Sequence, residues 1–403
     1  MTPDIAHACL QADSRARVCF VGGSAGHDGV HALRTQGSAI TAVNEPPQRG
    51  DVVIDLHGDR LLPGLINAHD HLGLNSMPGA APTRSYRDVR EWIAATSERR
   101  RTERHFQLCV GVERAQRLFL GGIKNLLSGV TTVVHHDPLY PELLQPQFPV
   151  RVLEHYGWAH SLYLDGAAAV RNSYLATREA DPWIIHVAEG VSRDAAEEFD
   201  TLDALGCIGA RTLLVHGVAL DRAQRARLVQ AGAGLIWCPS SNESLFGRTA
   251  EVDELAACGR VALGTDSRLS GARDLLEELQ IARRCCLLQE DELEQLVTTA
   301  GARLLRLNDR GALRAGYRAD LLVLPSGVPL GQAQRSDIRL VLIGGVPMYA
   351  DEDYAAQLGL QAWSPIQLDG SAKLLAAGVV ATLTRSSVTE PGLAMDMSDG
   401  RAA

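Results

Sequence analysis

The sequence predicts an α/β protein whose parallel strands form a barrel wrapped in helices. Between about residues 60 and 310, short aliphatic and β-branched runs alternate with segments whose apolar residues recur at helical spacing. This alternation favours parallel pairing, because a crossover helix can return the chain to the same end of the sheet. The runs are also apolar on both faces, which is typical of barrel strands covered by helices.

The composition is that of a globular protein with a large buried core. The 403 residues are 46% hydrophobic and 22% charged, with a net charge of −9 at pH 7. This acidic balance implies no general affinity for nucleic acid. No apolar run reaches the ~18 residues that a transmembrane helix needs, and the first residues, which include Asp4, do not resemble a secretory signal. The eight cysteines are irregularly spaced, and we interpret them as reduced thiols of a cytoplasmic protein.

The first 59 residues are rich in glycine, valine and turn residues, and they are too few to hold a good core alone. Short strands are expected at 17–21 and 51–56. A buried strand from Leu61 to His71, entered through a Pro-Gly bend, then leads into the barrel. Helices are expected over 86–97 and 105–127.

The alternating series follows. Its expected strands lie at 129–134, 149–154, 183–187, 212–216, 234–239 and 261–266. Its expected helices lie at 192–205, 221–231, 273–288 and 290–305.

After residue 310 the pattern returns to short strands, at 320–324, 338–343 and 346–349, with a hairpin turn at Gly344-Gly345. We expect this segment to pair with the first 59 residues as one small β domain built from both chain ends. The tail from about residue 385 is polar and is expected to be disordered.

Four of the expected strands end in residues that can bind a metal ion or move a proton. His69 and His71 stand two positions apart on one strand, so their side chains point to the same side. His186, His216 and Asp266 end three later strands. Because the carboxyl ends of parallel barrel strands open on one face, these residues are expected to meet there. The pattern predicts a metal site.

Six stretches carry a resemblance to a known family: LPGLINAHDH (62–71), HVAE (186–189), VHG (215–217), CPSSN (238–242), ALGTDS (262–267) and GALRAGYRADL (311–321). Together they resemble the amidohydrolase superfamily, specifically its deaminase and chlorohydrolase branch, over roughly residues 10 to 350. The resemblance implies a distorted (β/α)8 TIM barrel at 60–310 and a composite β-sandwich domain from 1–59 and 311–360. A C-terminal extension would occupy 361–403. The fourth-strand region is shorter than in relatives, so that strand is truncated or is formed by 157–162.

The resemblance also implies a zinc or iron ion held by His69, His71, His186 and Asp266. Three nitrogens and one carboxylate, with an open position for water, suit a hydrolytic metal. Two-metal members commonly use a carbamylated lysine from a mid-barrel strand. The lysines of this chain are Lys124, in a helical pattern, and Lys373, near the C-terminus. We therefore expect one divalent ion, with zinc favoured over iron.

Glu189 matches the residue that moves a proton to a ring nitrogen in the deaminases that resemble this chain. The alternative is a carboxylate that complements a helix N-terminus. His216, not needed for a second metal, is expected to hydrogen-bond the attacking water or the developing oxyanion. Asp266 would take a proton from the bound water and deliver it to the leaving amine.

The sequence specifies the substrate contacts less sharply. The candidates are His160, His136, Asn242 and Trp92, each of which could instead be a packing or structural residue. Arg171, Arg248 and Arg268 are candidates for binding an anionic group.

We expect a homodimeric enzyme that acts on a small molecule and hydrolytically deaminates an amino-substituted heterocycle or similar amidine. One alternative is a hydrolase of the same superfamily with a cyclic amide, halide or alkylamine leaving group. The other is a non-catalytic metal-binding protein on the same fold.

Overall fold

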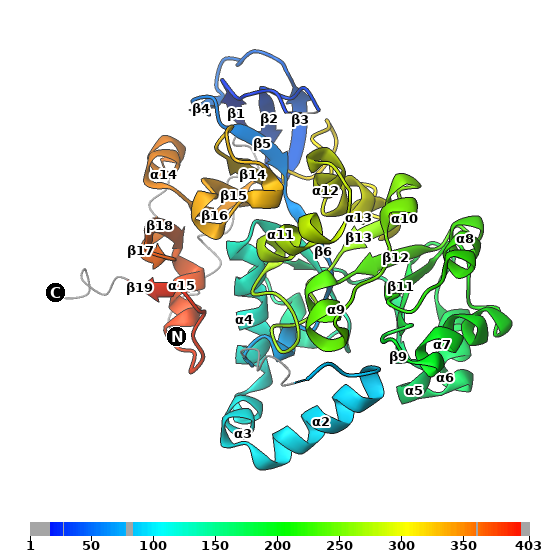
Figure 1. Ribbon diagram of the computed structural model, residues 1–403. Helices are drawn as coiled ribbons and strands as arrows, with labels where there is room; N and C mark the ends of the chain where they lie inside the picture. Colours follow the sequence, from blue (N-terminus) through cyan, green and yellow to red (C-terminus); the bar gives the residue numbers. More distant parts are fainter. Residues whose placement is uncertain (1–16, 27, 78–83, 360–361, 396–403) are drawn as a thin grey trace.

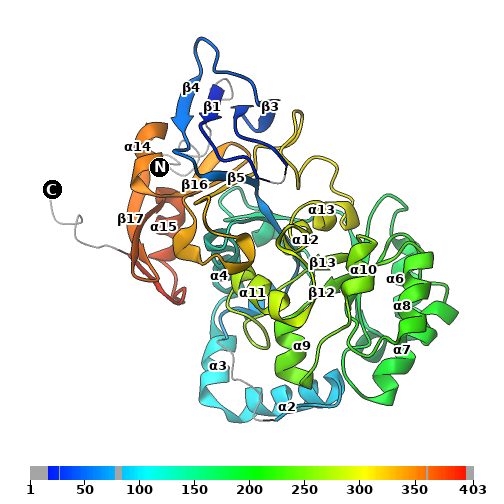
Figure 2. The same ribbon diagram turned by 45° about the horizontal axis from the view of Figure 1, so that its top comes forward.

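The computed structural model describes residues 17–26, 28–77, 84–359 and 362–395. Figure 1 shows two bodies of strands. Strands from both ends of the chain lie at one side, and strands from the middle of the chain lie among most of the helices. Figure 2, with the top of the molecule turned forward, shows the same division. Within the described ranges, no helix is long and apolar enough to cross a membrane.

The middle of the chain forms two parallel sheets, with strand orders β13-β12-β11-β10-β9 and β6-β7-β8. Their bounds are β6 Leu65–Asp70, β7 Val130–His135, β8 Arg151–Val152, β9 Gly157–Ser161, β10 Trp183–Val187, β11 Thr212–His216, β12 Gly234–Trp237 and β13 Val261–Leu263. A parallel bridge between Asp70 and Asp266 links β6 to the chain just after β13. Strands β8 and β9 are edges, and no ladder joins them among the described residues.

Strands β6, β7 and β10 to β13 are buried on both faces, as their apolar runs predict, whereas the edge strands β8 and β9 are only partly buried. Side chains alternate between two environments because the strand period is two. Ile66, Ile184 and Ile236 belong to one hydrophobic cluster, whereas Trp183 and Ile185 belong to the larger cluster that includes residues of the surrounding helices. Strand β9 is the second of the two possibilities considered for the fourth strand.

The helices of this part are α2 Val89–Thr102, α3 Arg104–Gly111, α4 Arg114–Leu127, α5 Leu162–Asp165, α6 Ala167–Ala176, α7 Arg193–Ala204, α8 Arg222–Gln230, α9 Pro239–Phe246, α10 Asp253–Ala257, α11 Leu275–Cys285, α12 Glu290–Leu296 and α13 Thr299–Leu304. Two expectations are corrected. The helix predicted over 105–127 is divided, because Val112 takes an extended ψ of 138° between α3 and α4. The helix predicted over 290–305 is likewise two helices, separated at Val297 and Thr298.

Strands from the chain ends form two further sheets, in the orders β3-β2-β1-β4 and β19-β17-β18-β16-β15-β14-β5. Their bounds are β1 Arg17–Val21, β2 Leu33–Gln36, β3 Ala39–Val43, β4 Val52–Asp55, β5 Arg60–Pro63, β14 Leu321–Leu324, β15 Leu340–Ile343, β16 Val346–Ala350, β17 Trp363–Leu368, β18 Ser371–Ala376 and β19 Leu393–Met395. Phe20 and Ile54 share one hydrophobic cluster with Leu321 and Tyr354. Helices α14 (Glu352–Leu358) and α15 (Ala377–Leu383) accompany these strands.

The C-terminal tail differs from its expected disorder as far as residue 395. Strand β19 pairs with β17, and Glu390 is only 2% exposed. In this polar segment Glu390 forms buried ion pairs with Arg268 and Arg335, which the composition alone does not predict. Residues 396–403 lie outside the described residues. The first 16 residues, on which the expectation about a secretory signal rests, also lie outside them. The seven cysteines within the described ranges are all free thiols.

Candidate metal centre

Side chains from the ends of β6, β10 and β11 and from the loop after β13 converge on one point. His71 Nε2 lies 3.4 Å from His186 Nε2. Asp266 Oδ1 lies 3.8 Å from His71 Nε2 and 3.9 Å from His69 Nε2. Ligand atoms of His69, His186 and His216 lie within 4.8 Å of one another, as do those of His69, His71 and Asp266. The structure therefore brings the five residues of the sequence pattern together.

Three of these imidazoles use their Nδ1 atoms in hydrogen bonds that lead away from the centre. The pairs are His71 Nδ1 with Asp137 Oδ2 at 2.9 Å, His186 Nδ1 with His160 O at 2.7 Å, and His216 Nδ1 with Asn242 Oδ1 at 2.8 Å. Because each partner is an oxygen acceptor, each Nδ1 donates its hydrogen away from the centre, and each Nε2 is the ring atom left to face it. Partners of this kind orient metal-binding histidines in proteins.

His69 lies at the middle of the cluster with both ring nitrogens unpaired. It is fully buried, and its Nδ1 and Nε2 atoms have no hydrogen-bond partner among the described residues. Its ring packs edge-on against those of His71 and His186. A buried polar atom without a partner is costly, and a metal ion would satisfy the lone pair. The donor set therefore fits a divalent metal ion.

The electrostatics of the cluster act differently on its histidines: burial opposes the charged form of His71, but the Asp137 carboxylate outweighs it and raises the pKa of His71 to about 9. Burial, followed by the neighbouring imidazoles, lowers the pKa of His69 and of His186 well below the usual range. A neutral imidazole is the form that donates a lone pair to a metal.

Glu189 stands beside His216, with Oε1 at 3.6 Å from Nε2. The carboxyl is 7% exposed. Burial, followed by the charges of Asp266 and Glu198, raises the pKa of Glu189 well above its usual range. A carboxyl whose pKa is raised is better suited to act as a general acid. The alternative role at a helix N-terminus is filled by another residue, because the side chain of Ser192 caps α7.

Backbone strain is concentrated at these strand ends. Ala188, His216 and Asp266 have φ values of 56°, 73° and 53°, in the left-handed region that non-glycine residues rarely adopt. Such conformations persist only where the surrounding structure holds them, and they are common at functional sites.

A buried polar network supports β6 beneath the histidines. The ammonium group of Lys124, on α4, lies 3.2 Å from Asp70 Oδ2, 2.9 Å from Asn75 Oδ1 and 3.0 Å from Thr265 Oγ1. Neither Lys124 nor Asp70 is exposed. Through these bonds Lys124 connects β6 and the segment after it, which carry His69 and His71, to the loop that carries Asp266.

The weaker candidates lie at different distances from the centre. His136 stacks on His186 with 4.3 Å between ring centroids, and His160 Nε2 lies 3.9 Å from Asp137. Asn242 contacts His216, as described above. Trp92 packs with Phe106 and Phe246 in hydrophobic clusters. Arg268 is corrected as an anion-binding candidate, because Glu390 already pairs with its buried guanidinium.

Sequence reasoning missed Asp137 and Lys124 as members of this site. Asp137 follows the His135–His136 pair at the end of β7, so the rule that barrel strands present chemistry at their carboxyl ends could have found it. Nothing in the local pattern around Lys124 signals its partner, which lies 54 residues away.

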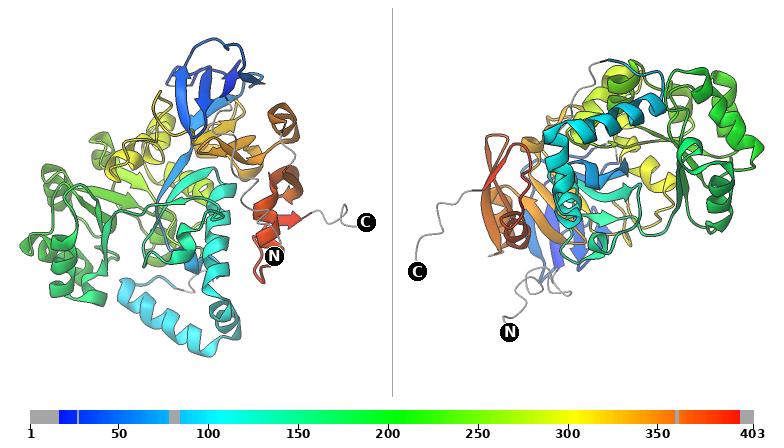
Figure 3. Two further views of the ribbon diagram at one scale, coloured as in Figure 1. Left: turned by 180° about the vertical axis from the view of Figure 1, so that it is seen from behind. Right: turned by 90° about the horizontal axis from the view of Figure 1, so that it is seen from below.

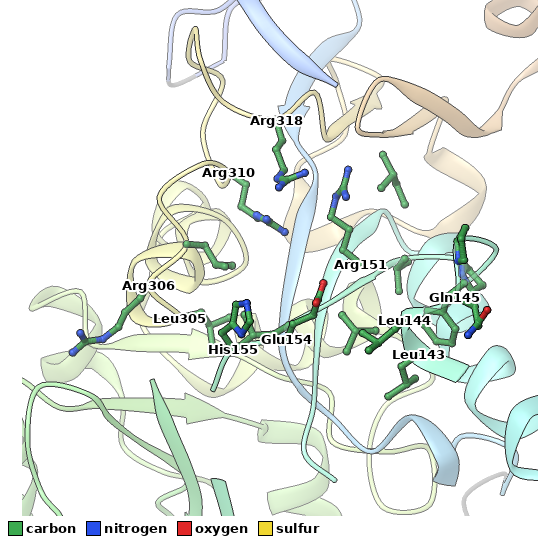
Figure 4. Close-up of a pocket in the computed structure, with 18 of the residues that line it drawn as sticks. Leu143, Leu144, Gln145, Arg151, Glu154, His155, Leu305, Arg306, Arg310 and Arg318 are labelled. Carbon is green, nitrogen blue, oxygen red and sulfur yellow. The ribbon is translucent and has the colours of Figure 1, made fainter. Parts of the chain in front are cut away.

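A separate cavity of about 640 Å³ lies elsewhere in the molecule. Figure 4 shows Arg151, Arg310 and Arg318 on one side of it and Leu143 and Leu144 on another. It is lined by residues at the starts of β8 and β10, whereas the histidines lie at strand ends. Three of its arginines pair with carboxylates, Arg151 with Asp320 and Arg310 and Arg318 with Asp309, and the fourth, Arg306, donates to the backbone oxygens of Glu179 and Ala210. We therefore do not include it in the candidate site.

The comparisons with known proteins agree with the geometry. The family model described as "Amidohydrolase family" matches residues 163–348. The 5-methylthioadenosine/S-adenosylhomocysteine deaminase 2 of Archaeoglobus fulgidus is 25% identical over 368 residues, which cover 77% of this chain and 84% of that protein. A triazine hydrolase variant superposes with a TM-score of 0.69 at 17% identity, covering 86% of this chain and 99% of the other. A zinc-bound adenosine deaminase from Xanthomonas campestris gives a TM-score of 0.66 at 19% identity, covering 86% and 96%.

Parallel strands that bring four imidazoles, a carboxylate and a buried carboxyl of raised pKa to one point define a metal-dependent hydrolase. The family match includes β10, β11 and β13, which carry or lead into His186, His216 and Asp266. Over residues 163–348 the chain is similar to the amidohydrolase family.

Proposed function

We propose that the protein is a metal-dependent hydrolytic deaminase of an amino-substituted heterocycle or a similar amidine. The observation that carries this proposal is the buried Glu189 carboxyl, whose Oε1 atom lies 3.6 Å from His216 Nε2 beside the metal-binding cluster. Hydrolysis at an amidine-like carbon needs an acid next to the ring nitrogen that gains electron density. Displacing a halide or opening a lactam needs that acid less.

The metal ligands in this proposal are His69, His71, His186 and Asp266, whose atoms converge as described. A divalent ion held there would lower the pKa of a bound water to ~7 and so supply the nucleophile at neutral pH. We favour one ion, because the Lys124 ammonium is bonded to Asp70, Asn75 and Thr265. Zinc is favoured over iron, in line with the zinc-bound structure to which the chain is similar.

The residues of the chain move the protons. Glu189 donates its proton to the ring nitrogen next to the attacked carbon, and it takes a proton back from the added hydroxyl group as the carbonyl forms and the amine leaves. Asp266 accepts a proton from the attacking water and passes it to the leaving amine, while Ser270 Oγ donates to Asp266 Oδ2 at 2.8 Å and holds the carboxylate in place. His216 accepts a hydrogen bond from the water at Nε2, because its Nδ1 hydrogen is bonded to Asn242.

A second candidate is hydrolysis with another leaving group, such as a halide, an alkylamine or a cyclic amide. The structural similarity to triazine hydrolase favours keeping it as an alternative. It would use the same metal centre but would depend less on Glu189.

We also infer the finer architecture. The Asp70–Asp266 bridge supports a distorted (β/α)8 barrel at 60–310. The pairing of β5 with β14 and the cluster that holds Phe20 and Leu321 support a composite β domain from 1–59 and 311–360. The cytoplasmic location and the homodimer stay predictions.

The proposal is tested by ammonia release over a panel of amino-substituted heterocycles. Because the Archaeoglobus relative is named a deaminase of adenosine-type compounds, 6-aminopurine nucleosides lead the panel, followed by aminopyrimidines, pterins and triazines. Zinc-loaded and iron-loaded protein are compared, each with and without chelator.

Release that chelator abolishes and added metal restores would support deamination. If the panel is silent while the protein binds metal, deamination is refuted, and chloride, alkylamine or ring-opening assays test the second candidate.

A further inference from the structure

The loop after β13 places Asp266 against β6. The backbone N–H groups of Thr265 and Asp266 both donate to His69 O, at 2.9 and 3.1 Å. The φ of Asp266 is 53°, so the surrounding contacts must hold this residue in a strained conformation. The precision with which Asp266 faces the histidines therefore depends on how the rest of the loop is fixed.

Arg268 fixes this loop from its far side. Its backbone N–H donates to Asn75 Oδ1 at 3.1 Å, and its Nε donates to Arg273 O at 2.7 Å. The Arg268 guanidinium thus links the start of the loop to its later residue Arg273. Its Nη1 and Nη2 atoms donate to the two carboxylate oxygens of Glu390, at 2.8 and 2.6 Å. This is a bidentate pair, the stronger geometry for an arginine and a carboxylate.

Glu390 reaches Arg268 from the C-terminal segment that follows α15. Figures 1 and 3 show α15 and β17 beside α4, the helix that carries Lys124. Ser387 Oγ, three positions before Glu390, donates to Gln116 Oε1 of α4 at 2.7 Å. The end of the described chain is thereby fastened to the body that carries the metal-binding cluster.

Arg268 depends on Glu390 for its counterion more than the neighbouring Arg335 does. Arg335 also donates to Glu390, at 2.6 Å, but Arg335 has two further carboxylates nearby: Asp369 at 2.8 Å and Asp274 at 3.6 Å. Among the described residues, Glu390 is the carboxylate that pairs with Arg268. The Arg268 side chain is 5% exposed, so without Glu390 it would be a buried charge without a counterion.

We propose that Glu390 is a positioning residue for Asp266, acting through Arg268. The C-terminal segment neutralises Arg268 and so holds the loop that directs the Asp266 carboxylate at the histidines. Without this pair, the guanidinium would turn toward water and draw the loop from its place. The inference rests on the proposed role of Asp266 as a metal ligand and proton carrier.

The proposal predicts that Glu390→Gln weakens zinc retention and lowers kcat, each by about 10- to 100-fold, with little change in KM. That range is typical of residues that orient metal ligands from behind. Glu390→Asp keeps the charge but has a shorter reach, so a loss of about 3- to 10-fold is expected, below that general range. In an Arg268→Gln background, Glu390→Gln should add little, because the pair is already broken.

The test measures zinc release to a chromophoric chelator, kcat and KM on a substrate of the wild-type protein, and the urea midpoint. Glu197→Gln is the matched control, since Glu197 pairs with Arg193 on the exposed face of α7. Zinc release reports on the site even if no substrate is known.

Faster zinc release and lower kcat in both Glu390 variants, with the control unchanged, would support the proposal. A lowered urea midpoint with unchanged zinc release and kcat would overturn it, because Glu390 would then be only structural. If Glu390→Gln does not fold, unchanged zinc release in Glu390→Asp would overturn it equally. Failure of the wild-type protein to bind zinc would instead refute the proposed function.

Discussion

Replacing Lys124 with methionine should destabilise the folded protein strongly, although methionine fills a similar volume. The ammonium group is fully buried and lies 3.2 Å from Asp70 Oδ2. The substitution leaves the Asp70 carboxylate buried without its cation. Removing one partner of a buried pair costs about 3–5 kcal/mol.

The contacts that remain place the expected loss near the lower end of that range. Asp70 keeps neutral donors, including Asn75 Nδ2 at 2.7 Å and Asn125 Nδ2 at 2.9 Å. These hydrogen bonds stabilise the carboxylate in part. We therefore expect a loss of ~3 kcal/mol, a large share of the stability of a typical domain.

The assay is urea unfolding of chelator-treated protein, followed by the fluorescence of the buried Trp183 and Trp237. Chelator treatment removes any stabilisation by bound metal. The double variant Lys124→Met/Asp70→Asn should recover part of the loss, because no unpaired charge remains. Arg193→Met, which breaks an exposed ion pair, is the control and should leave the midpoint unchanged. A loss below ~1 kcal/mol in Lys124→Met, or an additive double variant, would refute the reasoning.

Three further outcomes are expected. Asp266→Asn should abolish turnover while circular dichroism stays unchanged; activity close to wild type would sink the proposed mechanism. Glu189→Gln should lower kcat at least 100-fold, on the scale of a lost general acid, and retain bound zinc; equal loss of both would make Glu189 structural. Burial raises the pKa of Glu278 to about 8 from a usual value of 4.5, so the folded protein holds a proton that the unfolded chain releases between those values. Stability should therefore fall by ~1.4 kcal/mol per pH unit from about pH 4.5 to about pH 8, then level off, and Glu278→Gln should remove this slope in urea titrations. An unchanged slope in that variant would show that Glu278 is ionised in the folded state.

The parts of the site that the sequence predicts are those set by strand geometry. His69 and His71 share a side because strands repeat every two residues, and His186, His216 and Asp266 meet because parallel strands end on one face. The structure brings all five together. These inferences needed only local pattern and the direction of the chain.

The parts that the sequence does not predict depend on partners far apart in the chain. Arg268 and Glu390 are 122 residues apart, and no periodicity links them. The expected disorder of the tail is wrong up to residue 395 for the same reason. The division of the helix predicted over 105–127 was missed because apolar spacing does not register the extended backbone at Val112.

The pairing of β5 with β14 has a consequence for how the protein is made. Strand β5 lies directly before β6, the strand that carries His69, and its partner β14 places Leu322 opposite Leu62. During synthesis the N-terminal part emerges first, so β5 presents an open edge until more than three hundred residues have been translated. Asp266 likewise arrives long after the two histidines that it faces. A nascent chain therefore carries exposed strand edge without a complete metal centre, and it should depend on chaperones until its last third leaves the ribosome.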